Sequence, residues 1–212
     1  MSSSYWRRTA ALVCLIVAPL AQLAQYLVSP VRQGVPVAVQ VSSAAAHPGA
    51  MRLALLLDLP ILLILPAILF AGMAARSRLG TAGAAVGFAT ALGAGYLLAQ
   101  DVVIDAAARQ SARASAVALV SAYADSGAVT VLVALYLVGH VVGFALLGAA
   151  LIRSRAVPVW AGAALCAWPV LEMLGEGLDV KPVAAAGFVA LLVGFAACVP
   201  VFLSDRGARI PA

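Results

Sequence analysis

Charge is what this sequence has least of. Only 10% of the 212 residues are Asp, Glu, Lys or Arg, whereas 65% are hydrophobic, and the mean hydropathy is +1.09. Soluble domains contain about 25% charged residues. The composition therefore excludes an ordinary soluble domain and indicates a chain that lies in a membrane.

Motifs of soluble enzymes and of metal sites are also missing. The sequence contains no G-x-S-x-G elbow, no Walker A loop, no HExxH motif and no aspartate-rich DDxxD pair. Cys14, Cys166 and Cys198 lie singly inside apolar runs, where cysteine usually serves as a small buried hydrophobe. ATP-driven transport and aspartate-rich prenyl transfer are disfavoured, and we expect no metal and no cofactor.

Basic residues are few, and almost all of them are Arg. Twelve of the thirteen are Arg and one is Lys181, with a net charge of +5. They occur mostly in pairs between apolar runs, a pattern that sets the orientation of membrane spans and does not favour nucleic-acid binding. The preference for Arg is typical of a high-GC bacterial genome, so we predict a location in a bacterial cytoplasmic membrane.

Long hydrophobic runs are abundant. Six apolar segments are each close to the roughly 20 residues that a helix needs to cross a bilayer. They are continuous and lack the alternation of membrane strands, which predicts helices and not a barrel. We therefore predict an all-α polytopic membrane protein with six transmembrane helices in one bundle, forming a single domain over residues 1–212. The predicted spans are 9–28, 53–75, 79–99, 128–152, 157–175 and 182–203, with outer loops at 29–51 and 100–127.

The arginines predict the orientation of these spans. With six spans, four arginine pairs fall on one side of the membrane, and the positive-inside rule places that side, with both termini, in the cytoplasm. These pairs are Arg7 and Arg8, Arg76 and Arg78, Arg153 and Arg155, and Arg206 and Arg209.

The two outer connections differ in pattern. The alternating valines of residues 29–51 predict a short extended piece. Residues 100–127 lack Pro and lack Gly before Gly127, which predicts a helix. Four charged residues at spacing four, Asp101, Asp105, Arg109 and Arg113, would share one face of that helix. The simplest interpretation is a solvated continuation of the third membrane helix.

Two glycine pairs, Gly83 with Gly87 and Gly139 with Gly143, have the small-xxx-small spacing that lets membrane helices approach closely. Within apolar runs, Pro60 follows Asp58 by two residues and Pro169 precedes Glu172 by three. Breaks of this kind beside an intramembrane acid favour a cavity.

Polar residues occur at matching depth in the outer half of five predicted spans. The sixth span has nothing more polar than Cys198 and is expected to cover the bundle on its lipid side. This convergence predicts one outward-facing, acid-lined pocket, although the same groups would also serve to bond the helices to one another. The candidate pocket residues are Gln22, Gln25, Tyr26, Asp58, Tyr96, Gln100, Asp101, Tyr136, His140, Trp168, Glu172 and Glu176.

Two of these residues are the strongest functional candidates. A charged group within a span costs roughly 2.5–3.5 kcal/mol on insertion scales, so Asp58 and Glu172 need a compensating role. Three functions stay open. In the first, the pocket binds a small amphiphile or lipid. In the second, a protonated Glu172 or Asp58 acts as the general acid of an intramembrane enzyme. In the third, the chain is a proton- or cation-coupled transporter. The absence of an inverted repeat weighs against the last.

The basic turn before the fifth predicted helix, with the start of that helix, resembles a segment of known proteins. The segment from Leu151 to Trp160, LIRSRAVPVW, together with the six-span layout and the long connection after the third span, resembles a group of uncharacterised bacterial six-helix membrane proteins. That resemblance implies the fold and no activity. A more distant likeness in architecture is to the small integral-membrane terpene cyclases, which implies acidic residues that protonate a polyprenyl substrate.

Overall fold

The computed structural model describes residues 3–204, and these residues are helical, with short connections and no strand. The elements are α1 (Ser3–Val28), α2 (Val37–Ala46), α3 (Pro48–Ile61), α4 (Ile64–Ala75), α5 (Arg78–Gly87), α6 (Ala89–Ala108), α7 (Arg113–Ala124), α8 (Gly127–Val138), the π-helix η1 (Gly139–Gly143), α9 (Phe144–Ser154), α10 (Val159–Gly177), α11 (Lys181–Ala196) and α12 (Val199–Leu203). The predicted all-α class is confirmed.

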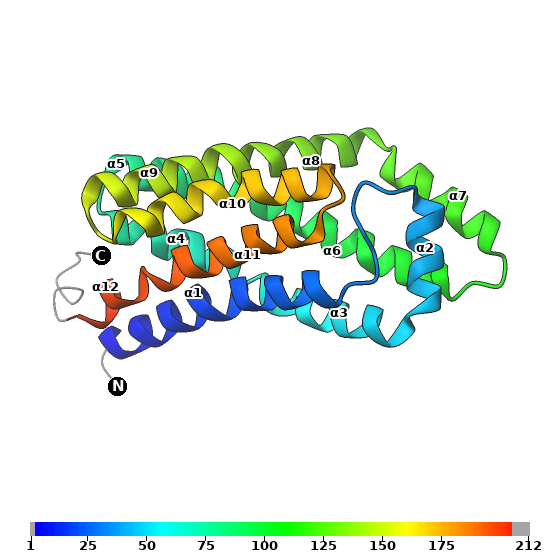
Figure 1. Cartoon of the computed structure of the whole chain (residues 1–212), viewed down its shortest axis with the longest axis horizontal. Coiled ribbons are helices and arrows are strands. Elements are labelled where there is room, and N and C mark those ends of the chain that lie inside the picture. The colour runs from blue at the N-terminus through cyan, green and yellow to red at the C-terminus, as the bar shows by residue number, and fades with distance from the viewer. Residues whose placement is uncertain (1–2, 205–212) are drawn as a thin grey trace.

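Several consecutive helices continue one another as single long segments. These are α3 with α4, α5 with α6, α8 through η1 to α9, and α11 with α12. Together with α1 and α10 they lie side by side as an elongated bundle (Figure 1). The start of α1 and the end of α12 lie at the same end of this bundle, and α2 and α7 lie at the other end (Figure 1).

Four described segments are long and apolar enough to cross a membrane, judged by length and composition: Tyr5–Val28, Pro48–Ala75, Gly127–Ser154 and Lys181–Leu203. They indicate a membrane-embedded protein. The two other long segments, α5 with α6 and α10, contain the acidic residues Asp101, Glu172 and Glu176. Arg206 and Arg209, which also entered the predicted orientation, lie outside the described residues.

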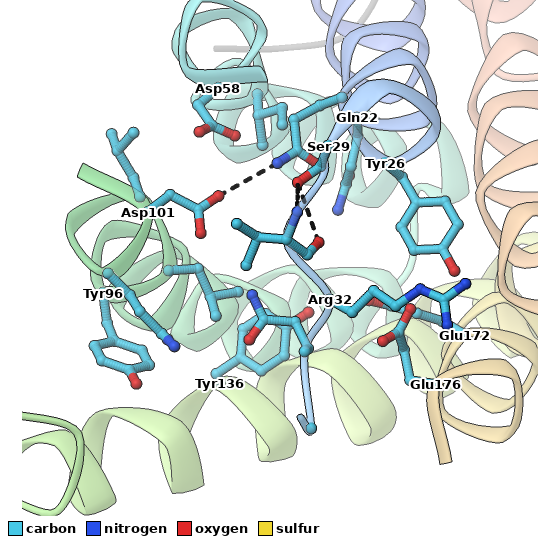
Figure 2. A pocket seen from close by; sticks show the side chains of 18 of the residues that line it. Gln22, Tyr26, Ser29, Arg32, Asp58, Tyr96, Asp101, Tyr136, Glu172 and Glu176 are labelled. Carbon is cyan, nitrogen blue, oxygen red and sulfur yellow. Dashed lines mark hydrogen bonds between the residues drawn. The ribbon is translucent and has the colours of Figure 1, made fainter. Parts of the chain in front are cut away.

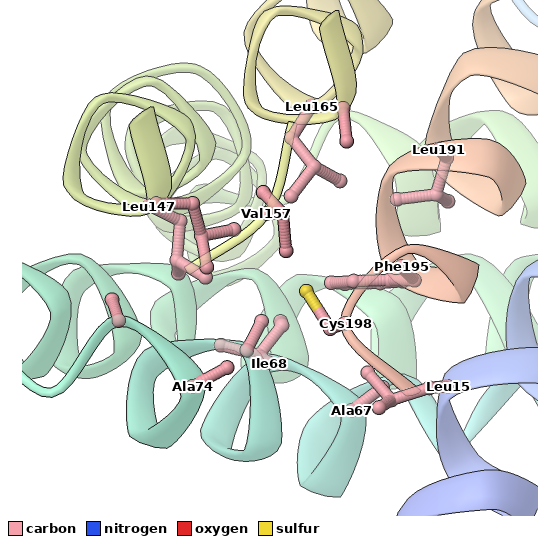
Figure 3. Packing of buried hydrophobic residues seen from close by; sticks show 14 of the residues in the cluster. Leu15, Ala67, Ile68, Ala74, Leu147, Val157, Leu165, Leu191, Phe195 and Cys198 are labelled. Carbon is pink, nitrogen blue, oxygen red and sulfur yellow. The ribbon is translucent and has the colours of Figure 1, made fainter. Parts of the chain in front are cut away.

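One of two apolar clusters fills the bundle between α1, α4, α9, α10 and α11 (Figure 3). We call this cluster the bundle core. It contains Leu15, Ile68, Phe144, Leu147, Leu165, Trp168, Leu191 and Phe195 among its larger members, and many alanines between them.

A Cβ atom added at Gly143 would lie 2.4 Å from the Cα atom of Gly87, and one at Gly83 would lie 2.8 Å from the backbone nitrogen of Leu147. The prediction that these glycines allow close helix packing is confirmed.

The second cluster lies at the end of the bundle that carries α2 and α7. We call α2, α7 and the adjoining ends of α3 and α6 the cap. Its apolar core consists of Val31, Val41, Ala44, Met51, Ile104, Ala107, Ala108 and Val120. The cap therefore has a small interior of its own, separate from the bundle core.

The extended piece predicted within residues 29–51 is wrong, because residues 37–46 form helix α2. Val41 and Ala44 lie three residues apart and are both buried, as is Gln40 beside Val41. One helical face thus packs on the cap, and this burial outweighs the preference of the valines for strands.

Residues 100–127 are helical over most of their length, as predicted, but they form two helices and not one continuation of α6. Helix α6 ends at Ala108, and α7 begins at Arg113, whose Nη2 donates a hydrogen bond to the carbonyl oxygen of Ala108 at 3.4 Å. Asp105 and Arg109 form the expected ion pair one turn apart. Asp101 is buried, so the four charged residues do not share one solvated face.

The last segment does not simply cover the bundle from the lipid side. Helix α11 packs against α10 and α1. Its residues Leu191 and Phe195 are fully buried in the bundle core, and Phe188 lines the cavity described below. An apolar sequence cannot distinguish a lipid-facing helix from a core helix, which is why that expectation was wrong.

Candidate functional site

A cavity of about 520 Å³ lies where the bundle meets the cap. Val31 of the cap core and Ile64 and Trp168 of the bundle core all line it, so it borders both clusters. Pockets for small molecules usually have volumes of about 300–1,000 Å³. The volume suits one small organic molecule or part of a lipid.

The cavity gathers residues from all six of the predicted spans. Every sequence-predicted pocket residue except His140 lines it: Gln22, Gln25, Tyr26, Asp58, Tyr96, Gln100, Asp101, Tyr136, Trp168, Glu172 and Glu176. Figure 2 shows Asp58 and Asp101 on one side of the cavity and Glu172 and Glu176 on the other. The structure thus brings these side chains together, while their role stays a prediction.

Two acids, Asp58 on α3 and Asp101 on α6, form one polar wall. Their exposed fractions are only 8% and 6%. Nε2 of Gln25 donates a hydrogen bond to Oδ2 of Asp101 at 3.4 Å. The other oxygen of Asp101, Oδ1, and Oδ2 of Asp58 are buried without a hydrogen-bond partner among the described residues. A buried acceptor without a partner costs free energy, which an incoming donor would recover.

The electrostatics of this wall are unusual. Burial raises the pKa of Asp101 from 3.8 to about 7, and the negative charge of the nearby Asp58 adds to the rise. Asp101 therefore changes its protonation state close to neutral pH. A carboxyl group whose pKa is shifted by burial and by a like charge beside a cavity is typical of a functional site.

The opposite wall is built on Glu172 of α10 and His140 of η1. Nε2 of His140 lies 2.8 Å from Oε2 of Glu172. That distance is typical of an ion pair, yet neither atom has a partner with hydrogen-bond geometry in the part of the chain that the structure describes. We therefore describe the pair as a close polar contact whose angle falls short of a hydrogen bond.

His140 lies behind the cavity surface and is 1% exposed. Its ring stacks on Tyr136, with ring centroids 4.9 Å apart, and meets the edge of Trp168, with centroids 4.3 Å apart. His140 thus touches the lining residues and does not line the cavity itself. Nε1 of Trp168 is also buried without a hydrogen-bond partner among residues 3–204.

Two junctions between consecutive helices border the cavity. The segment α3–α4 is interrupted after Pro60, and Ile61, Leu62 and Ile64 at this interruption line the cavity. The segment α5–α6 is interrupted at Phe88, next to Thr90, which also lines it. Proline removes a backbone donor. The backbone keeps right-handed helical dihedral angles at both places, with φ and ψ of −58° and −22° at Leu62 and of −62° and −25° at Phe88.

Residues 29–36, which we call the strap, cross the cavity between α1 and α2. Val31, Arg32, Gly34 and Val35 of the strap line the cavity. Gln40 of α2 holds the strap, because its Nε2 donates hydrogen bonds at 3.1 Å to the carbonyl oxygens of Arg32 and Val35.

Further contacts fix both ends of the strap. Oγ of Ser43 donates to the carbonyl oxygen of Pro30 at 2.7 Å. Arg32 forms an exposed ion pair with Asp179 in the turn between α10 and α11. In the same turn, Nζ of Lys181 donates to the carbonyl oxygen of Leu27 at 3.1 Å and lies 5.6 Å from the centre of the Tyr26 ring. The strap is therefore tied to the cap on one side and to α10–α11 on the other.

Sequence reasoning missed the strap, Gln40 and Thr90. The signals present were weak. Gly34 has a φ of +79°, which glycine adopts without strain, and Pro30 and Pro36 flank the strap. Gln40 is one polar residue within a valine-rich run. These features predict a turn and do not predict what the turn covers.

Within residues 3–204, no group of three or more His, Cys, Asp or Glu side chains is arranged to hold a metal ion. The polar groups of the cavity instead form two separate walls.

Comparisons with known proteins found no matching family model, no matching curated protein and no matching solved structure.

Proposed function

We propose that this chain is a bacterial inner-membrane protein that binds one small amphiphile or lipid in the cavity between bundle and cap. The observation that carries the proposal is a 520 Å³ cavity lined by buried polar atoms without partners, including Oδ2 of Asp58 and Oδ1 of Asp101. Such groups persist where a ligand satisfies them. Apolar side chains such as Leu97, Val133 and Leu137 complete the lining and suit a hydrocarbon chain.

The proposal includes six spans with both termini in the cytoplasm. It is supported by the arrangement of the described basic turns. The start of α1, the α4–α5 turn and the α9–α10 turn lie at the same end of the bundle (Figure 1). Arg7, Arg76 and Arg155 belong to these three places. A cluster of arginines at one end is typical of a cytoplasmic side. The cavity and cap then face outward.

A reporter fusion tests this orientation. Fluorescent protein that matures only in the cytoplasm, fused after Ala212, should be fluorescent, and alkaline phosphatase at the same place should be inactive. Alkaline phosphatase inserted in the α6–α7 connection should be active. Reversed activities at the two places would contradict the proposed orientation.

Native mass spectrometry tests the binding function. The protein, purified with its native lipids in a mild detergent, should retain a molecule of defined mass in one-to-one ratio. Trp168 lines the cavity and is 1% exposed, so Trp168→Ala enlarges the cavity and should change the retained species. Trp160→Ala, at an exposed site on the same helix, is the matched control. A protein that never carries a bound molecule would contradict the proposal.

One observation favours a second function, that of an intramembrane acid-catalysed enzyme. Glu172 lies against His140, whose ring stacks on Tyr136 and meets the edge of Trp168. A carboxylic acid beside aromatic rings suits protonation of an unsaturated chain, since ring faces stabilise the cation that forms. Turnover of a polyprenyl substrate should then disappear in Glu172→Gln while the unfolding temperature is unchanged. Unchanged turnover would remove Glu172 from the mechanism.

Coupled transport receives less support. A transported ion or solute needs a polar path through the bundle, and the bundle core beyond the cavity consists of apolar side chains in the described residues.

A further inference from the structure

The cavity has an excess of acidic groups in its interior. Besides Asp179, which pairs with Arg32, four acids line it, and we call them the interior acids: Asp58, Asp101, Glu172 and Glu176. The two basic residues that line it, Arg32 and Lys181, are both engaged at the rim, one with Asp179 and the other with the carbonyl of Leu27 and the ring of Tyr26. Neither basic side chain forms a described ion pair with an interior acid.

The Asp58–Asp101 wall offers acceptors and lacks donors. Oδ2 of Asp58 and Oδ1 of Asp101 are both without a partner among the described residues, and each residue is more than nine-tenths buried. The only described hydrogen bond to this pair is the 3.4 Å bond from Gln25. A ligand group that fits here must bring hydrogen-bond donors.

The charge of the ligand group distinguishes a hydroxyl donor from a protonated amine. A hydroxyl group brings one donor and no charge, whereas a protonated amine brings two or three donors together with a positive charge. Two carboxyl groups that face one site repel each other when both are ionised, and a cation between them removes this repulsion. A protonated amine therefore supplies both the hydrogen-bond donors and the positive charge that the two carboxyl groups require.

The remaining lining fits an amine that carries an apolar chain. Leu97, Leu98 and Val133 line the cavity, and so do the rings of Tyr96 and Tyr136. Aromatic rings attract a nearby cation and also pack against hydrocarbon. The wall thus suits a cationic head with an apolar body better than a free metal ion or a sugar.

We propose that the ligand is an amphiphile with a protonated primary or secondary amine, whose N–H groups donate to Asp58 and Asp101. This assignment rests on the proposed amphiphile-binding function and adds the chemistry of its head group.

Three decyl compounds with different heads test the assignment: decylamine, decanol and decanoate. The full chain is placed in phosphatidylcholine nanodiscs, and binding is followed by the fluorescence of Trp168, with Trp6 and Trp160, which are exposed, replaced by Phe. Hydrogen bonds to charged groups are strong enough that decylamine should bind at least about tenfold more tightly than decanol or decanoate. Decyltrimethylammonium has the charge without an N–H donor and should bind more weakly than decylamine.

Acid-to-amide variants identify the groups responsible. Asp58→Asn and Asp101→Asn together should reduce the preference for decylamine over decanol to about one, because amides supply no charge. Asp105→Asn is the matched control: it removes a carboxylate one turn along α6 that pairs with Arg109 and does not line the cavity. It should leave the preference intact. Thermal unfolding of each variant checks that its fold is retained.

The outcomes separate this inference from the proposed function. Decanol or decanoate binding as tightly as decylamine would overturn the amine assignment, as would an unchanged preference in the double variant. Equal binding of decylamine and decyltrimethylammonium would overturn the role of the N–H donors. Each of these results still shows a molecule in the cavity. A retained native ligand without an amine would likewise overturn the assignment and support the proposed function.

Discussion

The bundle core and the cavity beside it are made from the same helices in opposite ways. In the bundle core, glycines and alanines bring backbones together around fully buried side chains such as Phe144 and Phe195. Around the cavity, side chains leave about 520 Å³ of space, and buried polar atoms lack hydrogen-bond partners among the described residues. Tight packing stabilises a fold, whereas unpaired polar groups destabilise it and are retained for function. The two regions should therefore respond oppositely to substitution.

The largest effect is expected for Phe195→Ala in the bundle core. Phe195 is 0% exposed, and loss of a buried phenyl ring should lower the free energy of unfolding by about 3–5 kcal/mol. Val193→Ala, at a 38% exposed site of the same helix, serves as control. Unfolding in mixed micelles measures both. Equal effects would show that the bundle core is no better packed than the surface.

The next largest effect is expected for Gly143→Ala. A Cβ atom there would lie 2.4 Å from the Cα atom of Gly87, so two backbones must move apart, at a cost of about 1–3 kcal/mol. Gly95→Ala adds the same methyl group to a helix with nothing within 4 Å and should be neutral or stabilising by up to about 1 kcal/mol. If both variants unfold alike, close approach of the helices does not limit stability.

On the cavity side, Gln40→Ala should loosen the strap more than it destabilises the protein. Two hydrogen bonds to strap carbonyls are lost, each worth about 1 kcal/mol. Amide hydrogen exchange should become faster in residues 29–36 and stay unchanged in the bundle core. Ser42→Ala, at an exposed site of the same helix, is the control. Unchanged exchange in the strap would show that Gln40 does not hold it.

The last prediction concerns the pH dependence that Asp101 gives to stability. Its pKa rises from 3.8 to about 7 on folding, so the folded state favours the protonated carboxyl group. Its contribution to stability is fully present below pH 3.8 and is lost as the pH rises through about 7. The unfolding temperature should fall between pH 5 and 8, and Asp101→Asn should reduce this fall. Asp125→Asn, at an exposed position, should not.

Much of the candidate site followed from the residues themselves. Gln25, Asp58 and Glu172 are polar residues within long apolar segments, and burying them costs enough that they must face one another or a cavity. Counting along helices of known rise then brings them to a common depth. These polar residues of the cavity lining were therefore predictable.

The strap and α2 were not predictable in the same way. Their residues are neither strongly apolar nor strongly charged, so their pattern fits a strand, a loop or a helix. Val41 and Ala44 become one buried face only because Met51 and Ile104 stand opposite them. Arg32 of the strap pairs with Asp179, which lies 147 positions along the chain.

By itself, the sequence determined the helical class, the affinity for a membrane and the identity of the polar residues, since hydropathy and helical spacing are local properties. Only the tertiary structure decided how these parts divide into a bundle core and a cap, which helices are interrupted, and what closes the cavity. Those features depend on contacts between residues far apart in the chain, and no local pattern specifies such contacts.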